Sequence, residues 1–232
     1  IAVAGALYFV AYIPAMKIKA KGNAVLSAAR DMKQVFSKND IDLLNSKMKG
    51  FVQTYTEFEN ESKTVYWASF IPYVADFKRG VEAGSYVIKA GQDAIAAITP
   101  YADLIGFKKG QSSFVEKSTE GRLQTAILTL DKVLGKIDSI SDNIKIAGEK
   151  IDQIDPHLYP EKIGKTEIRS KITNIKDQFT GMASLFVDAK PLLKNIPTIF
   201  GAKKEKTYLL LFQNDKERRA TGGFLTAFAV FK

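Results

Sequence analysis

The sequence contains no cysteine, and only one histidine and one tryptophan among its 232 residues. Without cysteine, a disulfide framework, a thiolate zinc site and a cysteine nucleophile are all excluded. A Ser-His-Asp triad would have to use His157, which lies between Pro156 and Leu158 in a predicted turn. We expect this histidine to be solvated. No nucleophile elbow or complete phosphate-loop motif is present, so we predict no catalytic residue, no metal site and no cofactor.

Charge and hydrophobicity indicate a folded protein without a nucleic-acid partner. The chain carries 34 Lys+Arg against 25 Asp+Glu, a net charge of +9, and 46% of its residues are hydrophobic. That hydrophobic content is enough to bury a core, which excludes global disorder. The excess of positive charge is spread along the chain, with lysines alternating with acidic residues in helical stretches. Nucleic-acid-binding domains usually concentrate their lysines and arginines on one face.

The first sixteen residues contain no charged side chain, and three lysines follow at Lys17, Lys19 and Lys21. A sixteen-residue helix is about 24 Å long, somewhat shorter than the ~30 Å hydrocarbon core of a bilayer. The chain also starts at Ile1, so we predict that residues 1–21 are the C-terminal part of a transmembrane anchor, with the lipid bilayer as a partner. The alternative is a buried helix of a soluble domain. The lysines alone would favour a cytoplasmic C-terminal side, but that rule compares two flanks, so the orientation stays open.

From residue 22 to residue 200, apolar residues recur at alternating steps of three and four, which predicts an elongated helical bundle. Asp40 is the expected N-cap of one of its helices, and the segment Trp67–Pro72 interrupts the pattern. Gly84 and Gly91 lie one heptad apart on an apolar stripe. Glycine normally weakens a helix, so we predict that a neighbouring helix approaches closely at these two positions.

The second half of this region has the same spacing in two stretches, 123–154 and 168–193, joined by a proline-containing segment at 156–160. This arrangement predicts a coiled-coil-like antiparallel helical hairpin, about 50 Å long. We expect Pro191 to kink or end the last helix, and Gly201 to follow its end.

The last part of the chain changes from helical to strand-like spacing. Residues 208–212 form a continuous apolar run, residues 213–223 are polar, and residues 224–231 are apolar again, which predicts two strands. Two strands alone do not make a stable sheet. We therefore expect residues 201–232 to be the start of a truncated α/β domain that follows the mainly α part of the chain.

The segment Tyr208–Phe224 (YLLLFQNDKERRATGGF) resembles a motif of a bacterial family, domain-of-unknown-function family 4012. The matching residues are Gln213, Asn214, Glu217, Arg219, Thr221, Gly222, Gly223 and Phe224. Arg218 departs from the motif, where an apolar residue is usual, and the Trp67–Pro72 break is also similar to the family. The resemblance implies an N-terminal membrane helix, a helical region and then an α/β domain outside the membrane, with no settled activity.

The polar segment between the two predicted strands is the candidate ligand-binding site. It comprises Gln213, Asn214, Glu217, Arg218, Arg219, Thr221, Gly222 and Gly223. Arginine is a preferred partner of phosphate and carboxylate groups, and the glycine pair permits positive φ angles. The structural alternative is an ion pair between Glu217 and Arg219 that stabilises the turn.

Three functions are compatible with these features. The first is a membrane-anchored, extracytoplasmic scaffold or stalk of the bacterial cell envelope, which contacts protein partners or itself along the bundle and presents a C-terminal domain. The second is an envelope glycopolymer-processing enzyme that binds a phosphate-bearing lipid through Arg218 and Arg219. The third is an extracytoplasmic sensor module. We favour the scaffold because no catalytic constellation is present.

Overall fold

The computed structural model describes residues 8–103, 107–108, 118–202, 204–214, 216–217 and 223–231. It confirms a mainly helical chain. The long helices are α2 (Ile13–Phe36), α3 (Ile41–Lys63), α4 (Pro72–Ile98), α5 (Thr119–Val133), α6 (Ile137–Asp152) and α7 (Ile168–Ile199). Short turns of helix are η1 (Tyr8–Tyr12), η2 (Tyr66–Ala68), η3 (Thr99–Tyr101), η4 (Leu134–Lys136) and η5 (Pro156–Leu158). The strands are β1 (Lys162–Ile163), β2 (Thr166–Glu167), β3 (Tyr208–Asn214) and β4 (Phe224–Phe231), paired as two antiparallel hairpins.

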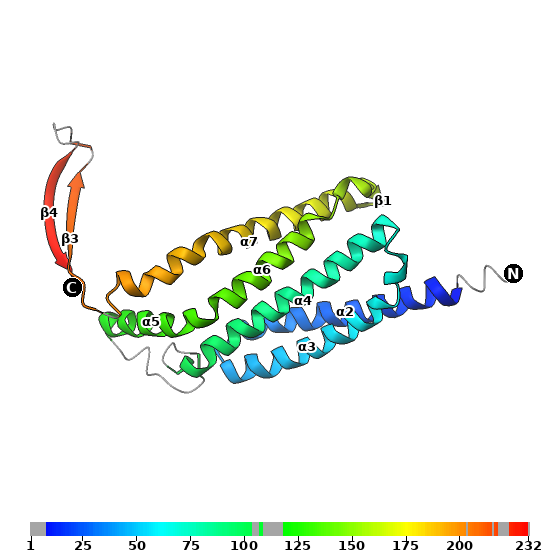
Figure 1. The fold of residues 1–232 in the computed structure, drawn as a ribbon, viewed down its shortest axis with the longest axis horizontal. Helices are drawn as coiled ribbons and strands as arrows, with labels where there is room; N and C mark the ends of the chain where they lie inside the picture. Colours follow the sequence, from blue (N-terminus) through cyan, green and yellow to red (C-terminus); the bar gives the residue numbers. More distant parts are fainter. Residues whose placement is uncertain are drawn as a thin grey trace.

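The helices form an elongated bundle in which α4 is the central element (Figure 1). Helices α2 and α3 pack against each other, and α4 contacts α3 on one side and α6 on the other. Helix α7 packs on α6 as the outermost helix, with α5 near its end. Figure 1 places the start of α2 at one end of the bundle and the β3–β4 hairpin at the opposite end. The start of α2 and the two long strands therefore lie at opposite ends of the bundle.

The hydrophobic core lies between α2, α3 and the adjoining face of α4. Its buried residues are Val35, Ile41, Leu44, Met48, Tyr55, Ile88, Ile95 and Ala102. The start of α3 is fixed by its N-cap, because the Leu43 backbone N–H donates a hydrogen bond of 2.9 Å to the Asp40 carboxylate. This confirms Asp40 as the predicted cap, and the predicted break at Trp67–Pro72 corresponds to η2 and the start of α4.

The two glycines of α4 face α3, and long side chains of α3 fill the space beside them. A Cβ atom added to Gly84 would lie 2.7 Å from Cζ of Tyr55, and one added to Gly91 would lie 3.2 Å from Cε of Met48. The hydroxyl of Tyr55 passes over Gly84 and donates a hydrogen bond of 2.6 Å to the Val81 carbonyl. Burial raises the pKa of this phenol, with a further contribution from the carboxylate of Glu59. Gly84 is thus the position that lets a buried tyrosine bridge two helices.

The opposite face of α4 packs on α6 through small side chains. Ala83, Ala90 and Ala97 are buried at heptad spacing, and they lie across the helix from Ile88 and Ile95 of the core. Polar contacts link the same two helices at the edges of this interface. Nζ of Lys150 lies 2.6 Å from a carboxylate oxygen of Glu82, and the Ser139 hydroxyl donates a hydrogen bond of 2.6 Å to Asp93. Alanines at these positions allow the two helices to lie close together along their length.

A buried carboxylate joins the start of α4 to the turn between α6 and α7. Asp76 is only 2% exposed and pairs with Arg79 at 2.6 Å. The Tyr159 hydroxyl donates a hydrogen bond of 3.3 Å to the same carboxylate, and the ring of Tyr159 packs edge-on against Tyr73. Burial, followed by the negative charge of Asp76, raises the pKa of Tyr159 to about 12. Pairing makes a buried charge tolerable here and fixes the turn to the bundle.

The second half of the bundle departs from two predictions. The helix expected across residues 123–154 is divided by the 3-10 turn η4 into α5 and α6. Helix α7 continues through Pro191 and ends at Ile199, so of the two predicted effects of Pro191, a kink or an end, the end is wrong. Pro191 lies on an exposed part of the helix, where water can satisfy the carbonyl that loses its N–H partner. Gly201 follows the end of α7 with a φ of +77°, as predicted.

The N-terminal region is described from residue 8 onward. There η1 leads into α2, which continues without a break across the predicted boundary at residue 21. Within the described ranges, no helix is both long enough and apolar enough to cross a membrane. Residues 1–7 of the predicted anchor lie outside those ranges.

Replacing Gly84 with alanine should destabilise the protein although alanine is the better helix former. The added methyl group would overlap Tyr55, and we expect the free energy of unfolding to fall by about 1–3 kcal/mol. Gly50→Ala in α3 is the matched control, because nothing lies within 4 Å of its added Cβ. It should raise stability by about 0.5–1 kcal/mol. Urea unfolding of both variants measures the difference, and equal effects of the two substitutions would contradict the packing described here.

Alkaline pH should destabilise the protein partly through Tyr159. In the unfolded chain its phenol loses a proton near pH 10, whereas in the folded chain it keeps the proton to about pH 12. The stabilisation from this group is therefore complete below pH 10 and is lost as the pH rises toward 12. Tyr159→Phe removes the titrating group and keeps the ring. Its free energy of unfolding should depend less steeply on pH between 10 and 12, and an unchanged slope would refute the assignment.

Candidate functional site

The two predicted strands are confirmed and form an antiparallel hairpin at one end of the bundle (Figure 1). Their register runs from Tyr208 opposite Phe231 to Asn214 opposite Phe224, with one irregularity after Phe212. At this irregularity the Thr226 hydroxyl donates a hydrogen bond of 3.0 Å to the Phe212 carbonyl. The hairpin is attached to the bundle at its base, where the Tyr208 hydroxyl donates a hydrogen bond to the carbonyl of Ile199.

The structure describes only half of the predicted ligand-binding residues. Gln213 and Asn214 are the last residues of β3, and the Glu217 backbone N–H donates a long hydrogen bond of 3.4 Å to the Asn214 carbonyl. Arg218, Arg219, Thr221 and Gly222 lie outside the described residues. Both the phosphate-binding hypothesis and the Glu217–Arg219 ion pair therefore stay predictions.

Gly223 is required by close packing at the end of the hairpin. A Cβ atom there would lie 2.7 Å from the carbonyl oxygen of Asn214 and 2.9 Å from Nε2 of Gln213. Gly223 is buried between these groups at the end of the hairpin. Its role is to let the two chains approach each other where the strands meet the turn.

Both faces of the β3–β4 hairpin are apolar and exposed, which the strand pattern alone does not predict. The exposed residues are Leu209, Leu210, Leu211, Phe212, Phe224, Leu225, Phe228, Val230 and Phe231. Consecutive residues of a strand point to opposite faces, so this series places large apolar side chains on each face. Phe228 is 70% exposed. An isolated hairpin of this kind is marginally stable, and a contiguous apolar patch marks an interaction surface.

Helix α7 carries a second exposed apolar surface, which we call the α7 seam: Ile175, Met182, Leu185 and Leu192. These residues are separated by steps of seven, three and seven, the a/d spacing of a coiled coil. The apolar spacing of residues 168–193 includes Ile175 and Met182 and predicts that both are buried, but these side chains are 67% and 63% exposed. The reason is that α7 is the outermost helix and has a neighbour only on its inner side.

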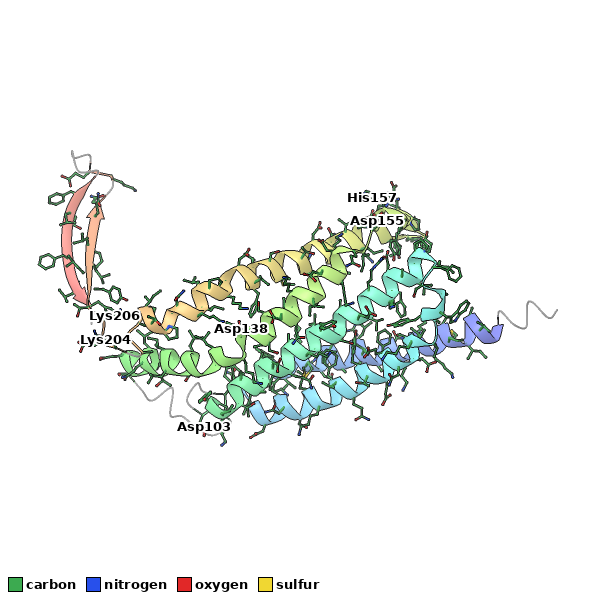
Figure 2. All side chains as sticks on the ribbon, in the orientation of Figure 1. Asp103, Asp138, Asp155, His157, Lys204 and Lys206 are labelled. Carbon is green, nitrogen blue, oxygen red and sulfur yellow. The ribbon has the colours of Figure 1, made fainter. Side chains whose placement is uncertain are left out.

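Polar contacts hold the inner side of α7 to α6. Asp138 of α6 accepts hydrogen bonds of 2.7 Å from Nζ of Lys190 and of Lys194, and Figure 2 shows it along this interface. These lysines, Lys190 first, lower the pKa of the Asp138 carboxyl. Ala183 is buried, and a Cβ atom added to Gly148 of α6 would lie 3.5 Å from its methyl group. Helix α7 is thus anchored along one side and leaves the seam on the other.

A cavity of about 560 Å³ lies where the hairpin meets α5 and the end of α7. Leu123 and Ile127 of α5 line it together with Phe200, Tyr208 and Phe231. Lys206 also lines it, and Figure 2 shows this lysine and Lys204 at the base of the hairpin. The size suits a small ligand. Half of the lining residues are hydrophobic or aromatic, and the others include Glu120, Glu205 and Lys206. The cavity is therefore a junction of apolar surfaces with charged side chains beside them.

The remaining titratable candidates have structural roles. His157 is exposed, as predicted, and its backbone N–H donates a hydrogen bond of 2.9 Å to Asp155 (Figure 2). Two nearby glutamates of α3 form ion pairs. Glu57 pairs with Lys21 of α2 at 2.5 Å, and Glu59 pairs with Lys63 at 3.4 Å. The hydrogen bond from Lys21 lowers the pKa of Glu57. In the part of the chain that the structure describes, no three acidic or histidine side chains converge as a metal site would require.

Comparison with known proteins adds no further assignment. No protein-family model, no curated protein and no solved structure matches this chain. The resemblance of residues 208–224 to family 4012 therefore stays a prediction. The functional argument rests on the two exposed apolar surfaces and on their positions in the bundle.

Proposed function

We propose that this chain is a membrane-anchored, extracytoplasmic scaffold of the bacterial cell envelope that assembles with protein partners through the β3–β4 hairpin and the α7 seam. The observation that carries the proposal is the exposure of two apolar surfaces on an otherwise well-packed bundle. The hairpin lies at the far end from the start of α2. Helix α4, with 27 residues, is about 40 Å long, so the bundle separates the two ends by at least that distance.

Membrane anchoring is supported by the uncharged segment 1–16 and the three lysines after it. A span would need residues 1–7, which lie outside the described ranges. The extracytoplasmic side is supported by the resemblance of residues 208–224 to family 4012, whose members are anchored proteins with an external domain. The lipid bilayer is then one partner, and the bundle holds the hairpin away from it.

The chemistry of the two surfaces defines the protein partners. The α7 seam, with its heptad spacing, fits another helix that packs as in a coiled coil, from a second copy or from another protein. The hairpin has unpaired strand edges and two apolar faces, so it fits further strands and the helices that cover them. These would form the C-terminal domain that the scaffold presents. In both cases, association removes exposed apolar side chains from water, at about 25 cal/mol per Å² of buried apolar area.

The seam can be tested by adding charge to it. Met182→Lys combined with Leu185→Lys places two positive charges in the middle of the seam, where a helix partner would have to desolvate them. We expect association of the chain to weaken at least tenfold, measured by light scattering across a concentration series and by chemical crosslinking in membranes. The helical circular dichroism should not change, because both side chains are exposed.

The matched control is Ser170→Lys with Ser184→Lys, which adds the same charge to exposed polar positions of α7 outside the seam. Association should survive in this variant. The proposal fails for the seam if both double variants associate equally, and it fails for the whole chain if no association occurs at any concentration.

A further inference from the structure

A cluster of exposed aromatic and aliphatic side chains lies at the end of the bundle where α2 begins. We call this surface the tip and define it by Trp67, Phe70, Ile71, Tyr73 and Leu158. Trp67 is 63% and Phe70 is 77% exposed, and their rings contact each other at a centroid distance of 6.4 Å. Neither the core nor the two surfaces described above accounts for these side chains.

The tip is a rigid surface made by two separate connections of the chain. Trp67 and Phe70 belong to the α3–α4 connection, and Leu158 belongs to the turn between α6 and α7. The Tyr73 hydroxyl joins them with a hydrogen bond of 2.8 Å to the Leu158 carbonyl. The Asp76–Tyr159 contact lies directly behind this junction. The apolar side chains are therefore held in place on a supported surface.

The register of α2 and α3 places the tip beside the end of the uncharged N-terminal segment. Lys21 pairs with Glu57, and a Cβ atom on Gly22 would contact the ring of Phe58 at 3.4 Å. Because the two helices are antiparallel with equal rise, this register puts the last residue of α3 opposite residues 15–17 of α2. Trp67 follows four residues later. The tip therefore lies beside the position in α2 at which the uncharged N-terminal residues end and the lysines begin.

This combination has the chemistry of a bilayer interface. Tryptophan and tyrosine concentrate at the headgroup level of membranes, because their rings are apolar and their N–H or O–H groups are polar. Lys17 and Lys19 are exposed at the same level of α2, where they suit anionic lipid phosphates. The acidic side chains of the nearby β1–β2 turn are paired, Glu161 with Arg169 and Glu167 with Lys162.

We propose that the tip docks on the surface of the lipid bilayer, with Trp67 and Phe70 at the boundary between headgroups and hydrocarbon. This inference rests on the proposed membrane anchoring, which brings the tip to the bilayer, and goes beyond it. Docking gives the bundle a second contact with the membrane besides the anchor. Two contacts fix the direction in which the bundle projects, so the hairpin is held at a defined height above the bilayer.

Tryptophan fluorescence can test docking at one defined site, because all tryptophan fluorescence of the chain comes from Trp67. The full chain is reconstituted into vesicles of phosphatidylcholine and phosphatidylglycerol, with and without brominated acyl chains. If the tip docks, Trp67 emission shifts to shorter wavelength and brominated lipid quenches it, while acrylamide quenches it less than in the unfolded chain. Flotation of the vesicles reports anchoring independently.

The outcomes separate the two proposals. A chain that floats with the vesicles while brominated lipid leaves Trp67 emission unchanged is anchored but not docked, which overturns this inference alone. A chain that does not float contradicts both the anchoring and the docking. Emission that shifts only as the protein-to-lipid ratio rises, without quenching by brominated lipid, would show that a second copy covers the tip, and this would also overturn the inference.

Variants that keep Trp67 as the fluorescent probe test whether its apolar neighbours contribute to docking. Phe70→Ser with Ile71→Ser leaves Trp67 in place and removes two apolar neighbours, so quenching by brominated lipid should fall at least twofold while flotation is unchanged. Leu209→Ser with Leu210→Ser makes the same type of change on the exposed hairpin and should leave the quenching unchanged. Unaltered quenching in the Phe70/Ile71 variant would contradict docking through the tip.

Discussion

The architecture depends on one constraint, which is that α4 is packed by helices on two opposite faces. Gly84 lets Tyr55 of α3 lie across one face, and alanines at heptad spacing line the face toward α6. A larger residue on either face would separate the neighbouring helices. Helices α2 and α3 are thereby joined to α6 and α7 in a single elongated body, with α7 at the outside. The two ends of the body differ because the chain begins its helices at one end and forms its long hairpin at the other.

Much of this architecture follows from local sequence signals. Alternating apolar spacing identifies the helices, Asp40 marks the start of α3, and the Trp67–Pro72 break marks the connection to α4. Gly84 and Gly91 could be recognised as positions of close packing because glycine weakens a helix and is expected on an apolar stripe only where a neighbour leaves no room for a side chain. The strands were recognisable by the change in periodicity after residue 206. Each of these signals acts over a few residues, which is why sequence alone reveals them.

The features that sequence did not reveal depend on the neighbours of each helix. Apolar spacing predicts that a stripe packs against something, but Ile175 and Met182 have no neighbour in the described chain because α7 is outermost. Asp76 is equally unpredictable, since its burial requires Tyr159 from 83 residues away. The same applies to the tip, which two distant connections assemble. Of the candidate ligand site, the sequence predicted the two strands correctly, whereas the close packing around Gly223 depends on the opposite strand.

We propose that the bundle is fixed at a membrane by one end and offers apolar surfaces to partners elsewhere, and the central point of this proposal is the side of the membrane on which the bundle lies. Single cysteines at Ser139, which is exposed, and at Ser62, which is fully buried, provide the most direct measurement in this cysteine-free chain. With a membrane-impermeant thiol reagent on intact cells, the account predicts labelling at position 139 and none at position 62 until the protein is denatured. Labelling at position 139 only after cell lysis would place the bundle in the cytoplasm and contradict the account.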